Sequence, residues 1–355
     1  MLSRTADHLF WMARYTERAE NTARLLDVNV QTAMLPQSAE SAETGWRAML
    51  SICELQPHFD EKFGILTAKD VIDFMVRDPN NPSSIVSCLR AARENARAVR
   101  GTLTTEVWET HNATWLETQD RLRGSRLEHD PSQFFEWVKY RSHLSRGVTI
   151  GTMLIDEALN FIRLGTFLER ADNTARLLDV KFHNAKQIKQ TQSQSRRGRV
   201  QSQSQSQSQS QSQSQSQSQS QSQSQTEEAP DSETQVDFYY WAAILRSVSG
   251  FEAYRKVYRN VITPARVADF LILRGDMPRS LLACLEEVIA NLQKVGNDVS
   301  KDTERFAGKL HAELRFHSVD DILREGLHDY LTKFLERIFE LGNRISSDFL
   351  VPLTA

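Results

Sequence analysis

The sequence has few cysteines and no excess of charge of one sign, and each absence excludes a class of protein. Its three cysteines, Cys53, Cys88 and Cys284, are scattered over 355 residues and form no CxxC pattern. This argues against a disulfide framework and against a thiolate zinc site. Lys and Arg number 43 against 46 for Asp and Glu, a net charge of -3. Such a balance lacks the basic surface of a nucleic-acid-binding protein, so we expect no nucleic acid among its partners.

Long apolar runs are also missing. No stretch approaches the roughly 18 apolar residues that span a bilayer. The first residues, MLSRTADHLFWMARYTER, carry charges throughout the window in which a signal peptide needs an apolar core. Scattered cysteines fit a reducing compartment. We therefore expect a cytoplasmic protein with no membrane partner.

What the chain does contain is helical periodicity, while strand-like alternation and hairpin dipeptides such as Asn-Gly are absent. It also repeats itself. The segment ERAENTARLLDV, Glu17 to Val28, returns as ERADNTARLLDV, Glu169 to Val180, with eleven of twelve residues identical. Further along, VIDFMVRDPNNPSSIVSCL, Val71 to Leu89, resembles VADFLILRGDMPRSLLACL, Val267 to Leu285.

Trp46 and Trp241 form a third match between these two, in the same order along the chain. Three ordered matches predict two copies of one helical unit, over residues 1–150 and 151–355. We therefore predict an all-α fold, a duplicated helical bundle in which a pseudo-twofold axis relates the copies within one integrated domain.

The second copy is lengthened by an insertion. Residues 201–225 alternate Gln and Ser, and a segment without apolar side chains cannot offset the entropy of ordering. We predict a disordered insertion over residues 188–234. It is interpreted as a tolerated loop expansion, because each doubling of loop length costs only about 0.6 kcal/mol. The alternative is a Gln-rich segment that interacts with other chains.

Each copy is predicted to contain a motif helix, a helix around the tryptophan, a long helix that begins at a Pro-Ser segment, and a closing helix. A short helix is predicted to lead to the Pro-Ser segment. Pro in the first turn and a capping Ser suit a helix N-terminus. The predicted ranges are 4–34, 41–56, 83–122 and 131–147 in the first copy, and 153–187, 236–259, 279–309 and 319–348 in the second.

Both faces of the motif helix are repeated. Tyr15, Ala19 and Leu26 lie on an apolar face that is predicted to join the core. Substituting an exposed charged residue far from any site changes stability by no more than about 0.5 kcal/mol. An ordinary solvent-exposed face would therefore have diverged between the copies. The charged face is therefore constrained by partners inside the fold or by a ligand. Its candidate residues are Arg14, Glu17, Arg18, Asn21, Arg24, Asp27, Glu169, Arg170, Asn173, Arg176 and Asp179.

Two interpretations of this face remain open. In the first, the residues form a buried ion-pair network, which must be nearly neutral because each desolvated ion costs several kcal/mol. In the second, they line a cleft between the two motif helices. There, Arg18, Arg24, Arg170 and Arg176 bind carboxylate or phosphate groups, and Glu17 or Glu169 faces an amine.

Motifs of known active sites and metal centres are scarce. The nine histidines form no HExxH pattern, and Glu325 with His328 gives a single Glu-x-x-His spacing where a carboxylate-bridged metal bundle needs two. No Gly-rich phosphate loop, GxSxG segment or Cys/His nucleophile is present. We expect no metal, no cofactor and no recognisable catalytic constellation.

The N-terminal MLSRTADHLFWMARYTERAENTARLLD resembles the opening of the bacterial alpha-E family, helical proteins named for a repeated Glu-Arg signature. The resemblance continues through ARENARAVRGTLTTEVWETHN, LGTFLERADNTARLLD, WAAILRSVSGFEAYRK and LRGDMPRSLLACL, and covers almost the whole chain outside the Gln/Ser tract. The sequence departs from the pattern at Ala158, Leu159 and Asn160, where a Gly-Trp-Arg type of segment is expected. This departure weakens the argument that both copies bind a ligand with the same geometry.

Proteins similar to this one are commonly encoded beside circularly permuted ATP-grasp proteins and transglutaminase-like cysteine peptidases. The resemblance therefore implies a non-catalytic helical partner of an ATP-grasp amide ligase in peptide synthesis or modification, which holds an amino-acid or peptide ligand in a Glu/Arg-lined cleft. A transglutaminase-like peptidase is implied as a further partner. The alternatives are an amide-bond hydrolase or transferase with its own site in that cleft, and an inert structural scaffold.

Overall fold

The structure, a computed structural model, describes residues 1–34, 39–124, 126–179, 232–259 and 261–350. Throughout these residues the chain forms helices and no strand, which confirms the all-α prediction. None of the described helices is both long and apolar enough to cross a bilayer. The pseudo-twofold relation between the copies and their division at residue 150 stay predictions.

The first half of the chain contains eight helices within the described residues. They are α1 (Ser3–Ala33), α2 (Ala39–Ile52), α3 (Gln56–Lys62), α4 (Ala68–Val76), α5 (Ile85–Ala98), α6 (Thr105–Arg121), α7 (Arg126–His129) and α8 (Pro131–Thr152).

The second half begins with a helix over residues 157–179. The helices after it are α10 (Ser232–Ser247), α11 (Phe251–Tyr258), α12 (Pro264–Ile272), α13 (Leu281–Val295), α14 (Lys301–Phe316), α15 (Val319–Glu325) and α16 (Leu327–Phe349). The predicted insertion, 188–234, lies outside the described residues except for 232–234, which belong to α10.

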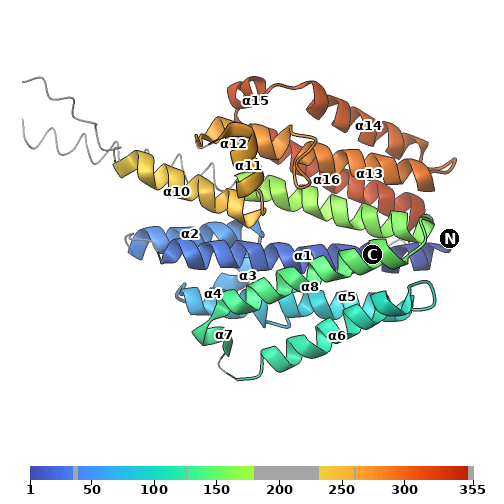
Figure 1. The fold of residues 1–355 in the computed structure, drawn as a ribbon, viewed down its shortest axis with the longest axis horizontal. Coiled ribbons are helices and arrows are strands. Elements are labelled where there is room, and N and C mark those ends of the chain that lie inside the picture. The colour runs from blue at the N-terminus through green and yellow to red at the C-terminus, as the bar shows by residue number, and fades with distance from the viewer. Residues whose placement is uncertain (35–38, 125, 180–231, 260, 351–355) are drawn as a thin grey trace, which may run out of the picture.

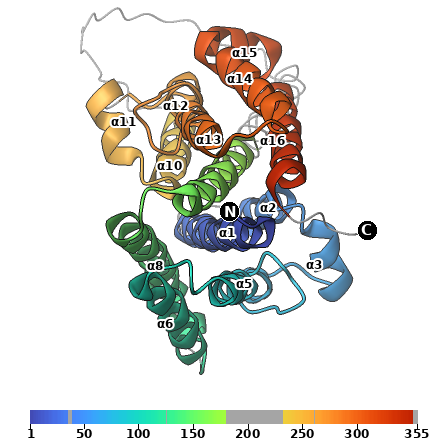
Figure 2. The ribbon, with the colours of Figure 1, turned by 90° about the vertical axis from the view of Figure 1, so that its right-hand side faces the viewer.

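Helix α1 lies in the middle of the molecule (Figures 1 and 2). Helices α5 and α8 pack against it on one side, with α6 covering both. The helix over 157–179 runs beside α1 on the other side, and α10 and α16 also contact α1. Because neighbours surround α1, several of its charged residues are buried as fully as its apolar ones: Glu17 is 1% exposed and Leu26 is 0% exposed.

The two halves of the chain have matching local geometry around the second repeated segment. Each holds three aromatic rings with centroid separations of 4.8, 5.5 and 6.2 Å. The rings are those of Phe59, Phe63 and Phe74 in the first half and Tyr254, Tyr258 and Phe270 in the second. Thr67 and Thr263 cap α4 and α12 in the same way, each accepting a hydrogen bond from a backbone N–H three residues later.

Most of the longer predicted helices are broken where the structure turns. The predicted 41–56 and 236–259 helices end near Glu54 and Ser249, which have φ values of 57° and 52°. Since the left-handed region is incompatible with a continuing α-helix, a short second helix begins after each. Gly326, at φ 107°, interrupts the predicted 319–348 helix in the same manner.

The predicted 83–122 and 279–309 helices are also each two helices. Thr104 is extended and caps α6 through the N–H of Val107, and Gly296 is extended after α13. The apolar periodicity resumes after each interruption, so the sequence pattern alone predicts one helix instead of two.

Helix α1 and the 157–179 helix cross closely at Gly165. A Cβ atom at Gly165 would lie 2.3 Å from the carbonyl oxygen of Phe10 and 3.2 Å from the Cβ of Ala13. Only glycine allows the two backbones to come this close. The crossing brings the Glu-Arg segments that follow on both helices within reach of each other.

We predict that Gly165→Ala destabilises the protein by about 1 to 3 kcal/mol, because the added methyl group forces the two helices apart. Gly147→Ala in α8 is the matched control, since its Cβ would meet nothing within 4 Å. Removing a helical glycine there should stabilise by up to about 1 kcal/mol. Urea unfolding measures both changes, and equal effects would contradict the close crossing.

Candidate functional site

Two Glu-Arg dipeptides face each other across the helix crossing. Arg18 donates hydrogen bonds to Glu169 at 2.6 and 3.1 Å, and Arg170 donates to Glu17 at 2.9 and 3.0 Å. Arg14 adds a guanidinium group 2.7 Å from Glu169. Each glutamate thus binds the arginine of the other motif helix.

Both glutamates of these reciprocal pairs are ionised. Burial alone would raise the pKa of Glu169, but Arg14 and Arg18 outweigh it and hold the pKa at about 2. Burial opposes ionisation of Glu17 as well, yet its pKa lies below the ordinary value, with Arg170 the largest opposing contributor. Neither carboxylate has the raised pKa that suits a general base near neutral pH.

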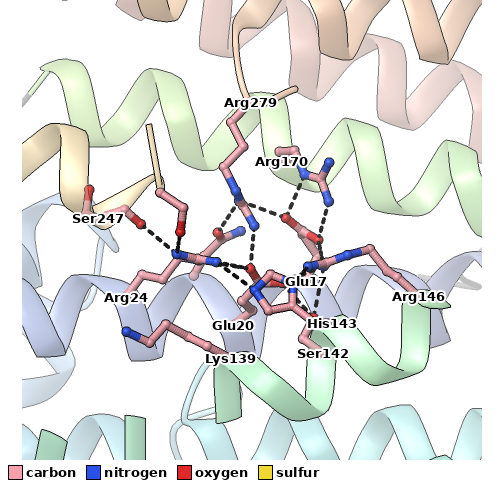
Figure 3. Close-up of polar contacts among 12 residues, drawn as sticks. Glu17, Glu20, Arg24, Lys139, Ser142, His143, Arg146, Arg170, Ser247 and Arg279 are labelled. Atoms are coloured by element: carbon pink, nitrogen blue, oxygen red, sulfur yellow. Dashed lines mark hydrogen bonds and ion pairs between the residues drawn. The ribbon is translucent and has the colours of Figure 1, made fainter. Parts of the chain in front are cut away.

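Glu20 connects this crossing to α8 and to the segment before α13 (Figure 3). It accepts hydrogen bonds from Arg24 at 2.8 Å and from Arg146 at 2.5 Å, and it forms an ion pair with Arg279. Arg146 and Arg279 also contact Glu17, at 2.9 and 3.1 Å. The result is one buried cluster, which we call the Glu17/Glu20 cluster; its charged members are Glu17, Glu20, Arg24, Arg146, Arg170 and Arg279.

Positive charge exceeds negative charge in this cluster, since four guanidinium groups face two carboxylates. Burial lowers the pKa of Arg279 to about 10; Glu20 and Glu17 oppose this, and Arg170 and Arg24 lower the pKa further. A buried excess of cations is costly. The cluster therefore creates a positive potential that favours an anionic group nearby.

Hydrogen-bond donors are in excess as well. One ring nitrogen of His143 lies 2.6 Å from Arg146 and the other lies 3.4 Å from Arg24. A neutral imidazole accepts through one nitrogen only. One of these arginines therefore faces an N–H, and its own donor lacks an acceptor on that side.

A cavity of about 280 Å³ opens beside the cluster, among α1, α6, α8, the 157–179 helix and α13. Its charged lining residues are Glu17, Arg146, Arg163, Arg170 and Glu287. Its apolar lining residues are Met12, Ala13, Ile150, Leu159, Ile162 and Phe167. An apolar wall with a few charged groups is typical of small-molecule sites, and the volume is near their lower limit of roughly 300 Å³.

His111 and Ser145 contribute a neutral polar part of the cavity wall. The Oγ atom of Ser145 lies 3.2 Å from Nε2 of His111. Burial, with a smaller contribution from Arg141, lowers the pKa of His111 to about 4, so the ring is neutral at physiological pH. A serine nucleophile needs a base that a third group orients, and no carboxylate in the described part of the chain contacts His111.

Thiol and metal chemistry find little support in the described residues. Burial raises the pKa of the Cys53, Cys88 and Cys284 thiols to about 12, so each is a protonated thiol at neutral pH. No group of three or more His, Cys, Asp or Glu side chains in that part of the chain is arranged to hold a metal ion.

The remaining candidate residues have other partners. Asn21 accepts a hydrogen bond from Arg279 at 3.1 Å, and Asn173 donates to the carbonyl oxygen of Glu169 at 2.8 Å. Both asparagines line a small cavity of about 20 Å³, large enough only for water. Asp27 binds Lys139 at 2.9 Å.

The other arginines of the two motifs, Arg24 and Arg176, contact the two residues whose backbone lies in the left-handed region. Arg24 donates to Oγ of Ser249 at 2.7 Å, and Arg176 donates to Glu54 at 2.5 Å. Arg176 also binds Asp172, at 2.8 Å. Asp179 lies 2.6 Å from His328, away from the cavity. The crossing thus unites Arg14, Glu17, Arg18, Glu169 and Arg170, whereas Asp27, Arg176 and Asp179 lie elsewhere.

Several site residues were missed by the sequence reasoning. They are Glu20, Arg146, Arg163, Arg279 and Glu287. Glu20 could have been predicted, because it lies in the repeated motif. It occupies the one position that differs between the copies, where it aligns with Asp172. The others lie outside the motif, and Arg279 corresponds to Ser83 in the first copy, so comparing the copies could not reveal it.

We predict that Glu17→Gln destabilises the protein by about 3 to 5 kcal/mol, because buried guanidinium groups lose their counter-charge. Glu43→Gln is the control, since Glu43 forms an exposed pair with Arg47 and its loss should cost less than about 0.5 kcal/mol. Chemical denaturation measures both. A loss below about 1 kcal/mol for Glu17→Gln would contradict the network.

Stability should also fall in acid. The pKa of Glu169 is about 2 in the folded protein against an ordinary 4.5, so its stabilising contribution is present above about pH 5 and lost as pH falls toward 2. Between pH 6 and pH 3 we expect this residue alone to remove about 2 kcal/mol from the free energy of unfolding. Denaturation at both pH values tests this, and Glu169→Gln should show the smaller pH dependence.

The comparisons with known proteins identify a family. A family model described as Alpha-E, a predicted alpha-helical domain with a conserved ER motif, matches residues 1–350. The chain is 30% identical over 142 residues to an uncharacterized protein of Mycobacterium bovis and to one of Mycobacterium tuberculosis. A third, from another strain of Mycobacterium tuberculosis, is 29% identical.

These matches cover 37% of this chain and only 15% of the length of each relative. No solved structure matches. The dipeptides Glu17-Arg18 and Glu169-Arg170, which make the reciprocal pairs, are ER motifs of the kind that the family description names. With the family model spanning nearly every residue, the chain belongs to the Alpha-E family.

Proposed function

We propose that this protein is a non-catalytic helical partner of an ATP-grasp amide ligase, and that it holds an amino-acid or peptide ligand in the 280 Å³ cavity beside the Glu17/Glu20 cluster. The observation that carries the proposal is this cavity, in which an apolar wall meets Glu17, Arg146 and Arg170. Guanidinium groups suit carboxylate ligands, and the excess of positive charge in the cluster favours one.

The rigidity of the surrounding network supports a binding role. Glu17 is hydrogen-bonded to Arg146 and Arg170, which come from two different helices. Side chains fixed in this way lose little conformational entropy when a ligand binds. The cavity is thus preorganised for a small molecule.

The partnership with a ligase is supported by the resemblance to Alpha-E proteins, which are commonly encoded beside ATP-grasp proteins. The curated relatives add a second argument, because the similar segment is a small part of a much longer polypeptide. Such an arrangement is expected of a helical unit that works beside another domain. A transglutaminase-like peptidase remains a second proposed partner, on the basis of the same resemblance.

An amide-bond hydrolase or transferase is less well supported. It requires a general base, and the pKa values of Glu17 and Glu169 are shifted down rather than up. Both carboxylates are also held by arginines of the chain itself. An inert scaffold does not account for the cavity.

The proposal is tested by purifying this protein with an ATP-grasp ligase of the same organism and measuring ligase turnover with and without it. We expect a stable complex and a lower KM for the amino-acid or peptide substrate. Ile150→Trp, at an exposed position that lines the cavity, should reduce this effect by blocking the entrance. Leu144→Trp is the matched control, exposed on the same helix but outside the cavity lining.

If no complex forms and the ligase rate does not change, the proposal is wrong. A complex whose KM is unaffected by Ile150→Trp would indicate a scaffold instead of a ligand-holding partner. Amide hydrolysis by the isolated protein would favour the enzyme alternative.

A further inference from the structure

Two opposite charges in the cavity wall lack an ion-pair partner among the described residues. Arg163, on the 157–179 helix, and Glu287, on α13, both line the cavity. Neither forms an ion pair with any residue that the structure describes. Glu287 receives one side-chain hydrogen bond, from Asn291 at 3.3 Å. This differs from Glu17 and its arginines, which are fully engaged with one another.

A ligand that satisfied both groups would carry a negative and a positive charge. The carboxylate of such a ligand can accept two parallel hydrogen bonds from the Arg163 guanidinium. Its ammonium group can donate to the carboxylate of Glu287. An anion alone, such as phosphate, would face the like charges of Glu17 and Glu287, and a cation alone would face three guanidinium groups.

The rest of the wall determines what joins these two charged groups. Leu159, Ile162 and Phe167, on the same helix as Arg163, form an apolar part of the wall, and a polar side chain of the ligand would lack hydrogen-bond partners there. A volume of about 280 Å³ limits the ligand to a small molecule. A single amino acid or a dipeptide meets both conditions.

We propose that the cavity binds a zwitterion, a free amino acid or dipeptide with an apolar side chain, whose carboxylate pairs with Arg163 and whose ammonium group pairs with Glu287. This inference rests on the proposed function, since it names the ligand class of the same cavity. Glu17, Arg146 and Arg170 are then positioning residues that keep the wall in place.

The test is direct binding to the isolated full-length protein, so it does not depend on the ligase. Isothermal titration calorimetry with L-leucine and L-phenylalanine should give measurable binding, whereas glycine should bind more weakly. N-acetyl-L-leucine lacks the ammonium group and L-leucinamide lacks the carboxylate. Each should bind roughly tenfold to a hundredfold more weakly than L-leucine, the usual effect of losing a hydrogen-bonded charge pair.

Variants assign each charge to its partner. Arg163→Gln should weaken L-leucine binding roughly tenfold to a hundredfold and abolish the difference between L-leucine and L-leucinamide. Glu287→Gln should abolish the difference between L-leucine and N-acetyl-L-leucine. The matched controls are Glu286→Gln, an exposed neighbour on α13, and Arg90→Gln, an exposed arginine on α5, neither of which lines the cavity. Both controls should bind as the unmodified protein does.

Three results would overturn the inference. They are no binding of L-leucine or L-phenylalanine up to about 10 mM, capped forms that bind as tightly as the zwitterion, and variants that weaken all three leucine compounds equally. Because substitutions of partly exposed side chains can still disturb the fold, melting temperatures of the variants accompany the titrations. The comparison of ligands on the unmodified protein stands even if a variant fails to fold.

Discussion

The reciprocal pairing of Glu17 with Arg170 and of Glu169 with Arg18 is the interaction on which the rest of the structure depends. Charges this deeply buried are tolerated only when each meets an opposite charge with good hydrogen-bond geometry. The pairs therefore fix how far each motif helix can slide or rotate against the other. Gly165 makes the approach possible, since a side chain there would hold the backbones apart.

The same pairs connect the packing of the helices to the cavity. Glu17 binds Arg170 on one side and Arg146 on the other, so α8 is joined to the crossing through a shared carboxylate. The cavity lies where these elements meet. Its charged wall is thus part of the framework, while Arg163 and Glu287 are added to it without an ion-pair partner in the described part of the chain.

The sequence predicted the helical class and the importance of the charged face, because periodicity and an internal repeat report directly on packing. It did not predict the breaks at Glu54 and Ser249, since neither residue is a glycine and their φ values follow from tertiary context. The cavity could not be predicted from the sequence either. Arg146 and Arg279 reach Glu20 from remote parts of the chain, and such a meeting depends on how several helices pack.

The two halves of the molecule are similar in framework but not in the cavity wall. In the repeat, Arg163 corresponds to Trp11, Glu287 to Ala91, and both counterparts are uncharged. A homodimer would have to change both copies of a surface at once, whereas a tandem fusion lets one copy diverge while the other preserves the fold. The duplicated chain thus carries two charges in its second half, Arg163 and Glu287, that the first half does not repeat, while both halves supply the rest of the cavity wall.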